Sequence, residues 1–224
     1  MPFKFTSDMS VEDANSLAVN LGIKHSVIPI GDVYNSFQKS LEEEFTGLGP
    51  DVTEENLQSR CRGVILMALS NKSGELVLTT GNKSETAVGY STLYGDTAGG
   101  FGVLKDVPKT IVYELSRYRN RISSVIPERI IERPPSAELA PDQQDSDSLP
   151  DYDILDKVIE MYVEQDKSKQ EIEESGIEKT IVDRVIRLID ISEYKRRQAP
   201  LGVKITARGF GKDRRYPITN KFLK

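Results

Sequence analysis

The residues with the clearest chemical potential lie between Leu76 and Glu85, where the sequence reads LVLTTGNKSE. Apolar, β-favouring residues lead directly into a polar turn with a glycine and then into a short predicted helix. This order brings hydroxyls, an amide, a carboxylate and free helix N–H groups to the carboxyl end of a strand, where open α/β sheets bind ligands such as phosphates. The same residues also fit an ordinary strand-to-helix turn capped by Asn or Ser, so the pattern alone leaves both interpretations open.

The composition excludes several other kinds of site. Cys61 is the only cysteine, which rules out an internal disulfide framework and a Cys-based metal cluster. It falls on the apolar side of a predicted helix, so we expect a buried, inert thiol. His25 is the only histidine, which argues against a zinc site built on several His residues and against a Ser–His triad.

The chain also lacks the signals of a membrane or secreted protein. Its longest apolar run, from Val64 to Leu69, is far shorter than the ~20 residues that a membrane span needs. The amino terminus has no signal-peptide pattern. We therefore expect a cytoplasmic protein with no membrane contact.

Basic residues are concentrated at the end of the chain. The net charge is −5, yet residues 195–224 contain ten Lys or Arg residues and one acid. Such a tail can bind nucleic acid, phosphate-bearing small molecules or an acidic neighbouring subunit. Few aromatic residues are interleaved with these charges, and the predicted helix around 181–191 carries acidic residues that phosphate would repel. We therefore expect no nucleic acid partner.

Helix and strand patterns alternate along the first part of the chain. The predicted helices cover residues 10–21, 32–41, 53–71 and 106–122, and the predicted strands cover 24–30 and 75–80. Ser10, Thr53 and Asp106 are the expected helix caps. This alternation predicts an α/β fold with a doubly wound parallel sheet.

The second part of the chain has a different character. Residues 133–151 are rich in Pro, Ser and acids and have no periodicity, so their composition alone indicates a disordered linker. Short amphipathic helices are then predicted around 154–162, 168–175 and 181–191.

Further segments accompany TTGNKSE in a fixed order. They are ENLQSRCRG at 55–63, AVGYSTLYGD at 87–96, KDVPK at 105–109, RPPSAEL at 133–139 and DRRYPITN at 213–220. Together they closely resemble the synthetase domain of glutamine-dependent NAD synthetases, a group of N-type ATP pyrophosphatases, over nearly the whole chain. Leu93 and Gly100 stand where ammonia-using relatives carry Lys and Asp, which favours the glutamine-dependent branch.

The resemblance also shows what the sequence lacks. The family's hallmark, an SGGxDS phosphate loop, does not occur, and the pair Gly99-Gly100 sits in a different loop. Residues 1–5 look like the second strand of the family's sheet. We therefore expect a carboxy-terminal fragment, truncated at the N-terminal edge of the sheet, without a glutaminase domain and inactive in isolation.

The same comparison suggests a division of the chain into parts. The expected parts are a partial ATP pyrophosphatase-type α/β domain at 1–132, a mobile nucleotide-contacting loop at 133–151, a helical region of the same domain at 152–197 and a basic tail at 198–224.

The activity that the resemblance implies is the ATP-dependent amidation of deamido-NAD, the nicotinic acid adenine dinucleotide. Its carboxylate attacks the α-phosphate of ATP and releases pyrophosphate, and ammonia then attacks the acyl-adenylate to give NAD and AMP. Glutamine, hydrolysed by the absent domain, would supply the ammonia, and magnesium would neutralise the charge on the pyrophosphate. The family also implies a homo-oligomer with deamido-NAD bound near a subunit interface.

Two other functions stay open at this point. One is another adenylating amidotransferase of the same class, such as a GMP synthetase-like enzyme or a tRNA-modifying ligase. The other is a non-catalytic module that binds substrate or mediates oligomerisation.

Family roles are carried over only to matching positions. The expected ATP-binding residues are Thr80, Lys109 and Ser136. The expected deamido-NAD-binding residues are Asn56, Glu85, Tyr90, Ser91, Thr92, Leu93 and Lys195. Glu85 is also the expected magnesium ligand, and no residue is assigned a catalytic role.

Overall fold

The computed structural model describes residues 1–219, so the last five residues of the predicted basic tail lie outside the described residues. The helices are α1 (Asp8–Leu21), α2 (Gly31–Leu41), α3 (Val52–Ser73), α4 (Lys83–Val88), α5 (Lys109–Ile122), α6 (Glu128–Glu132), α7 (Tyr152–Ile159), α8 (Lys169–Glu174), α9 (Lys179–Ile191) and α10 (Glu193–Arg196). A 3₁₀ turn, η1 (Asp145–Asp147), precedes α7, and a π-helical turn, η2 (Glu160–Glu164), follows it. The strands are β1 (Leu78–Thr79), β2 (Phe101–Gly102) and β3 (Leu201–Gly202).

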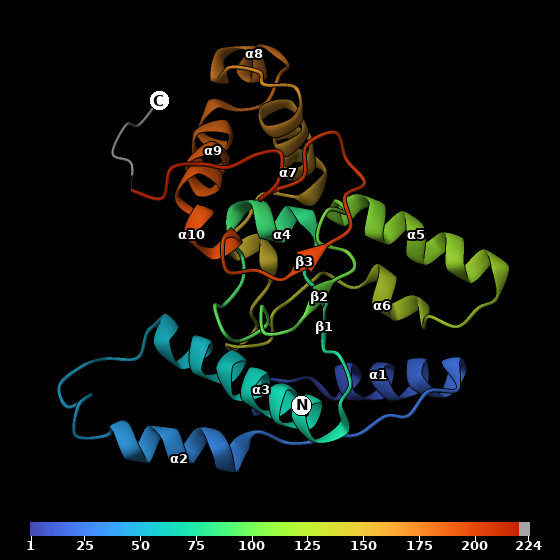
Figure 1. The fold of residues 1–224 in the computed structure, drawn as a ribbon, viewed down its shortest axis with the longest axis vertical. Coiled ribbons are helices and arrows are strands. Elements are labelled where there is room, and N and C mark those ends of the chain that lie inside the picture. Colours follow the sequence, from blue (N-terminus) through green and yellow to red (C-terminus); the bar gives the residue numbers. More distant parts are fainter. Residues whose placement is uncertain (220–224) are drawn as a thin grey trace.

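The three strands form one small parallel sheet in the order β1-β2-β3. In Figure 1, helices α1, α2 and α3 lie on one side of these strands, and α4 and α7–α10 lie on the other. This arrangement confirms the predicted α/β class with a parallel sheet. The third strand, however, comes from the segment that we predicted to be only a basic tail.

Two predicted strands are absent from the described part of the chain. Residues 1–5 and 24–30 have no strand assignment, although one hydrogen bond, from Ile30 N to Pro2 O at 3.1 Å, joins these two segments. The strand predicted at 75–80 is shortened to Leu78–Thr79. Apolar, β-favouring residues are therefore not sufficient to form strands in these segments, because a strand also needs a neighbouring strand to complete its main-chain hydrogen bonds.

Helix starts were predicted to within one turn. Ser7, not Ser10, caps α1, and Asp51, not Thr53, caps α3 with Glu54 completing a capping box. Helix α1 ends at Leu21, as predicted, and Gly22 follows as its C-cap in the left-handed conformation with φ of 64°. Asp106 does not cap α5, which begins at Lys109 after Pro108.

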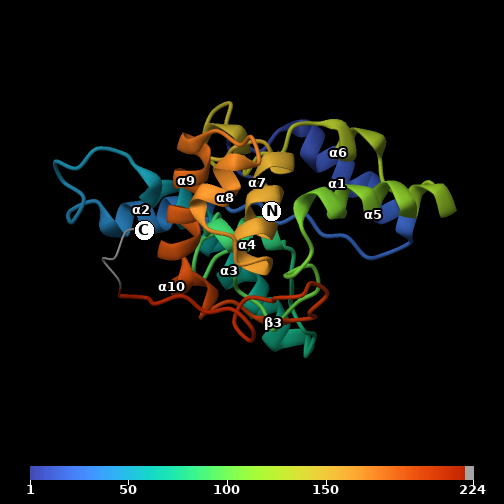
Figure 2. The same ribbon diagram turned by 90° about the horizontal axis from the view of Figure 1, so that it is seen from above.

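The apolar residues that recur at helical spacing along α5 are exposed in the structure. Leu115, Tyr118 and Ile122 are 48%, 56% and 66% exposed. In Figures 1 and 2, α5 extends away from the helical core on one side, and α2 does so on the opposite side. The apolar residues of α3 are likewise buried only in part, since Cys61 is enclosed as expected but Val64 is 59% exposed.

The main hydrophobic core lies between α4 and the helices of the second half of the chain. Its fully buried members are Ala87, Leu155, Val158, Val163, Ile172, Val182, Val185 and Ile189. A smaller cluster of Ile30, Tyr34 and Cys61 joins α2 to α3. Among residues 1–219, no helix has both the length and the apolar character needed to cross a membrane.

A buried arginine connects α4, α9 and the C-terminal segment. Arg196 is 3% exposed, and its Nε donates to Oε2 of the fully buried Glu193 at 3.1 Å. Its other nitrogens donate to the main-chain oxygens of Ala87 and Ile189, each at 2.6 Å. The guanidinium also lies over the rings of Phe210 and Tyr216, at 4.7 and 5.2 Å from their centres. Arg196 thus donates hydrogen bonds to carbonyls near the ends of α4 and α9, and its contacts with Phe210 and Tyr216 hold the C-terminal segment in place.

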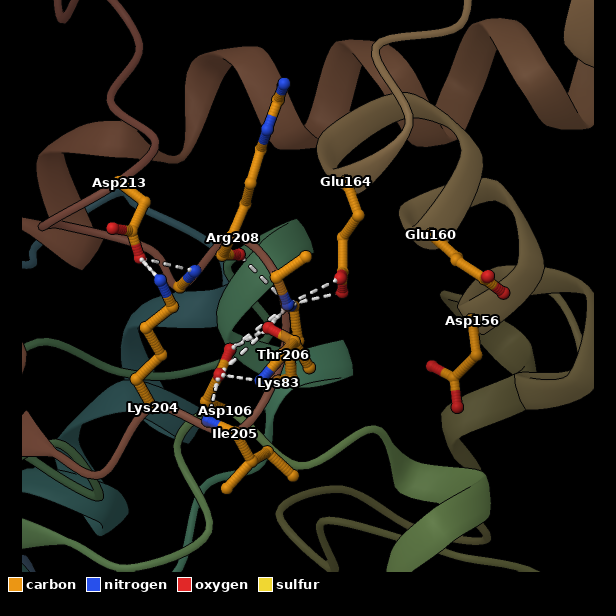
Figure 3. A network of polar contacts seen from close by, with 12 residues as sticks. Lys83, Asp106, Asp156, Glu160, Glu164, Lys204, Ile205, Thr206, Arg208 and Asp213 are labelled. Carbon is orange, nitrogen blue, oxygen red and sulfur yellow. Dashed lines mark hydrogen bonds and ion pairs between the residues drawn. The ribbon is translucent and has the colours of Figure 1, made fainter.

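A second buried cation holds the C-terminal segment against the start of α4. Figure 3 shows Lys83 at the centre of a polar network, with its Nζ 3.1 Å from Asp106 and 2.7 Å from Glu164. Lys83 also donates to the hydroxyl of Thr206 at 2.5 Å. Asp106 in turn accepts hydrogen bonds from the main-chain N–H groups of Ile205 and Thr206, each at 2.8 Å. Asp106, predicted as a helix cap, therefore anchors the chain just after β3.

The buried pair of Arg196 and Glu193 predicts a large loss of stability when the arginine is removed. We expect Arg196→Met to lower the free energy of unfolding by about 3–5 kcal/mol, because the buried Glu193 and two carbonyls lose their donor. Urea denaturation followed by circular dichroism measures this loss.

Arg197 provides the matched control, because its half-exposed guanidinium binds the other oxygen of the same Glu193 at 2.7 Å. We expect Arg197→Met to cost about 1 kcal/mol or less, as partly exposed ion pairs usually do. Equal losses in the two variants would show that burial of Arg196 is not what stabilises this junction.

Candidate functional site

The turn from β1 into α4 combines a helix cap with an ion pair. The side chain of Asn82 accepts from the N–H of Glu85 at 3.0 Å, and Oε2 of Glu85 accepts from the N–H of Asn82 at 3.2 Å. The interpretation of this turn as an Asn-capped helix start is therefore correct. The other oxygen of Glu85 accepts from Nζ of Lys109 at 3.1 Å. The cap thus fixes the position of the Glu85 carboxylate, and the ion pair holds the Lys109 ammonium group beside it.

Three recesses meet beside this turn. The first, which we call the Lys109 recess, has a volume of about 430 Å³ and is lined by residues that include Glu85, Lys109, Tyr113, Arg133, Ser136 and Asp145. The second, which we call the Asn56 recess, has a volume of about 750 Å³ and is lined by residues that include Asn56, Arg62, Ser91, Thr92, Gln143 and Lys195. The third is a chamber of about 40 Å³ that Glu85, Lys105 and Lys195 help to line. Tyr90 and Asp96 line all three.

Lys109 remains a cation in the first recess. Partial burial acts to lower its pKa, but the neighbouring carboxylate of Glu85 outweighs this effect and holds the pKa above its ordinary value. Its ammonium group also lies 5.3 Å from the ring centre of Tyr152 and 5.9 Å from that of Tyr113. The recess therefore presents a fixed positive charge between aromatic walls.

Lys195 supplies the corresponding cation of the second recess. Its Nζ donates to the main-chain oxygens of Gly89 and Ser91, each at 2.7 Å. Burial lowers its pKa below the ordinary value, while the charge of Asp96 opposes that shift. Gly89 permits the close approach of the neighbouring Ser192, because its φ is 69° and a β-carbon there would overlap the Ser192 hydroxyl.

The loop after Tyr90 is held against α3. The hydroxyl of Thr92 donates to the side-chain oxygen of Asn56 at 2.8 Å. The N–H of Thr92 donates to Asp96 at 2.6 Å, and the N–H of Asp96 donates to the hydroxyl of Ser59 at 3.0 Å. This chain of hydrogen bonds places the Asp96 carboxylate where the three recesses meet.

Ser136 lines the Lys109 recess, but its hydroxyl is engaged within its own segment. It donates to the main-chain oxygen of Gln143 and accepts from the N–H of Glu138 at 3.0 Å. A ligand that binds this hydroxyl must therefore replace one of these contacts.

The structure gathers most of the predicted site residues around Tyr90. Eight of the ten line at least one of the three recesses: Asn56, Glu85, Tyr90, Ser91, Thr92, Lys109, Ser136 and Lys195. Thr80 and Leu93 are not among the residues that line these recesses in the described part of the chain. Thr80 is exposed, and its neighbour Thr79 lines the small chamber instead. Leu93 accepts from Nε of Arg60 through its main-chain oxygen at 3.3 Å.

Two residues of the site were missed. Asp96 lies within the AVGYSTLYGD segment, so its motif was identified but its carboxylate was not singled out. Asp145 lies in the acidic segment 133–151, where nothing in the composition distinguishes it from its neighbours. It is nevertheless 5% exposed and accepts hydrogen bonds from Tyr90 and Tyr152.

The predicted magnesium site is not complete in protein ligands. Among residues 1–219, no group of three or more His, Cys, Asp or Glu side chains could hold a metal ion. Glu85 offers one carboxylate, which suits a magnesium ion that takes its remaining ligands from water and nucleotide phosphates. Glu85 as a magnesium ligand therefore stays a prediction.

Comparison with known proteins gives a consistent result. The sequence model described as NAD synthase matches residues 1–199. The glutamine-dependent NAD(+) synthetase of Acinetobacter baylyi is 56% identical over 222 residues, which cover 98% of this chain and 41% of that protein. The chain thus spans about two fifths of the length of this relative.

Solved structures extend the likeness to the fold. A glutamine-dependent NAD+ synthetase from Acinetobacter baumannii, in complex with ADP, is 50% identical with a TM-score of 0.59, and the match covers 97% of this chain and 39% of that one. A glutamine-dependent NAD(+) synthetase from Cytophaga hutchinsonii shares the fold, with a TM-score of 0.78, 24% identity, and coverage of 97% of this chain and 38% of that one. The resemblance indicated by the sequence motifs is confirmed, and the chain belongs to the NAD synthase family.

Proposed function

We propose that this chain binds ATP in the Lys109 recess and deamido-NAD in the Asn56 recess, for the ATP-dependent amidation of deamido-NAD to NAD. The observation that carries the proposal is the meeting of both recesses at Tyr90 and Asp96. Two nucleotides bound in this way would bring their reacting groups to one point, and holding reactants together is a major part of catalysis.

The Lys109 recess suits a triphosphate. Its fixed ammonium group attracts phosphate oxygens, and its aromatic and apolar walls suit a base or ribose. The relative from Acinetobacter baumannii was solved in complex with ADP, which supports the use of an adenine nucleotide here. When ATP binds, the ammonium group of Lys109 would contact its phosphates, either while it keeps its ion pair with Glu85 or after that ion pair has broken.

The Asn56 recess suits a dinucleotide. Its volume of about 750 Å³ lies within the range of small-molecule sites. Lys195 supplies a positive charge for a carboxylate or pyrophosphate, and the ring of Tyr90 provides a face on which a nicotinate ring can stack.

The proposed reaction follows from these positions. The deamido-NAD carboxylate attacks the α-phosphate of ATP, the bond to pyrophosphate breaks, and an acyl-adenylate forms. Ammonia then attacks the carbonyl carbon, AMP leaves, and the nitrogen loses a proton. The Asp96 carboxylate lies at the meeting point of the recesses and can accept that proton. The small chamber beside it has room for a molecule of the size of ammonia or water.

Several finer expectations belong to this proposal. Magnesium would be held by Glu85 together with the phosphates, and it would neutralise charge on the departing pyrophosphate. Glutamine would be the source of ammonia. We also propose a homo-oligomer located in the cytoplasm.

A substrate-binding role without turnover is the second candidate. Under this alternative, both nucleotides still bind in the same two recesses, so binding measurements test the shared part of both proposals.

Removal of the Lys195 charge is expected to weaken deamido-NAD binding. We expect Lys195→Met to raise the dissociation constant about 10- to 100-fold, because a charge-assisted hydrogen bond is lost while the apolar stem is kept. Isothermal titration calorimetry with deamido-NAD measures the change. Lys204→Met is the control, since Lys204 is half-exposed and pairs with Asp213 at 2.9 Å. Equal affinities in wild type and Lys195→Met would remove Lys195 from the site.

Removal of the Lys109 charge is expected to weaken binding of the ATP analogue. We expect Lys109→Met to weaken binding of α,β-methylene ATP about 10- to 100-fold and to leave deamido-NAD affinity within about threefold. Lys157→Met is the matched control, because Lys157 lines a different recess, beside Asp153 and Asp156. Loss of deamido-NAD binding in Lys109→Met, with ATP-analogue binding intact, would reverse the assignment of the two recesses.

A further inference from the structure

A buried carboxylate in the segment 133–145 is held by two phenols. Oδ1 of Asp145 accepts from the hydroxyl of Tyr90 at 3.1 Å, and Oδ2 accepts from the hydroxyl of Tyr152 at 2.7 Å. Among the described residues, Asp145 forms no ion pair, although it is only 5% exposed. A buried carboxylate is unfavourable unless hydrogen bonds satisfy its oxygens, and the two phenols satisfy both oxygens of Asp145.

The two phenols connect Asp145 to both recesses. Tyr90 lines the Asn56 recess as well as the Lys109 recess. The ring of Tyr152 lies under the ammonium group of Lys109, at 5.3 Å. Asp145 itself lines the Lys109 recess and is not among the residues that line the Asn56 recess. One carboxylate therefore orients a ring that lines both recesses and a second ring that lies against Lys109.

The main chain of Asp145 also closes the segment that precedes it. Its N–H donates to the main-chain oxygen of Pro135 at 3.0 Å, which draws residues 135–145 into a loop. Inside this loop, the N–H of Leu139 donates to the side chain of Gln143 at 2.9 Å. Ala137 lines both recesses, so the loop forms a wall that they share.

We propose that Asp145 is a positioning residue which, through Tyr90 and Tyr152, holds residues 133–145 as the common wall of the two nucleotide recesses. This proposal rests on the proposed function for the identity of the two ligands. The segment between the recesses then has one fixed position, and both ligands are placed relative to that position.

The chemistry of the side chain explains why a carboxylate serves here. A carboxylate only accepts hydrogen bonds, so both phenols must donate to it and both rings take defined orientations. Burial raises the pKa of both phenols above the ordinary value, and the nearby Asp145 carboxylate raises it further. Both hydroxyls therefore keep their protons. The isosteric Asp145→Asn retains one accepting oxygen and turns the other position into a donor, which opposes one of the two phenols.

The first arm of the test is hydrogen–deuterium exchange of the ligand-free chain, read by mass spectrometry. We expect amides in residues 136–145 to exchange about 10- to 100-fold faster in Asp145→Asn and in Tyr152→Phe than in the wild type, with exchange in α9 unchanged. Tyr162→Phe is the matched control, because Tyr162 is buried in the helical core and donates to Asp190 at 3.0 Å. This control should leave the exchange of residues 136–145 unchanged.

The second arm measures binding of deamido-NAD and of α,β-methylene ATP to the same variants by calorimetry. A role confined to the Lys109 recess would weaken only the ATP analogue. The shared wall predicts that both affinities fall about tenfold in Asp145→Asn and in Tyr152→Phe, because small displacements of positioning groups have large effects. Loss of deamido-NAD affinity is the decisive observation, since neither residue lines the recess proposed for that ligand.

The outcomes separate this proposal from the proposed function. Unchanged exchange in both variants, or a change in ATP-analogue affinity alone, overturns the role of Asp145. If Asp145→Asn does not fold, Tyr152→Phe decides the question by the same two readouts. If the wild type binds neither nucleotide, the proposed function fails, while the exchange arm still shows whether Asp145 holds the segment.

Discussion

The burial of the Arg196 guanidinium is the constraint on which the site depends. A cation in the protein interior needs hydrogen-bond partners, and each of the three guanidinium nitrogens of Arg196 donates one bond, to Glu193 or to a carbonyl near the end of α4 or α9. These partners fix the end of α4 against α10. Lys195 immediately precedes Arg196, so the same contacts aim its ammonium group at the carbonyls of Gly89 and Ser91. A requirement of the core thus sets the position of a charge in the Asn56 recess.

The site holds its other charges in contrasting ways. Lys109 and Glu85 form an ion pair at the start of α4, and a triphosphate or a metal ion would compete for one partner or the other. Lys195 is instead held by neutral carbonyls, so its charge is available to an anionic ligand. Asp145 is held by hydrogen bonds from two phenols and forms no ion pair within residues 1–219. These differences suit the distinct roles that we propose for binding and for positioning.

Local patterns in the sequence predicted helix ends and the burial of single residues better than they predicted contacts between distant segments. Asn82, Gly22 and the buried Cys61 follow from capping and periodicity, which depend on near neighbours in the chain. The role of Asp106 could not be predicted, because its partners Ile205 and Thr206 lie about a hundred residues later.

Long-range pairing also explains the errors in the predicted elements. Strand β3 was missed because residues 201–202 become a strand only by pairing with β2. Residues 24–30 carry strand-forming residues, but in the described part of the chain they do not pair into a ladder. Asp96 and Asp145 were missed for the same reason, since their significance arises from recesses built by distant segments.

The central claim is that the two nucleotides meet at Tyr90 and Asp96. A crystal structure of the chain with deamido-NAD and α,β-methylene ATP, in which the bond to pyrophosphate cannot be cleaved, tests this claim most directly. We predict that the nicotinate carboxylate and the α-phosphate lie about 3–3.5 Å apart beside these two residues, with deamido-NAD in the Asn56 recess. Nucleotides bound with these groups far apart, or deamido-NAD bound outside that recess, would contradict the account.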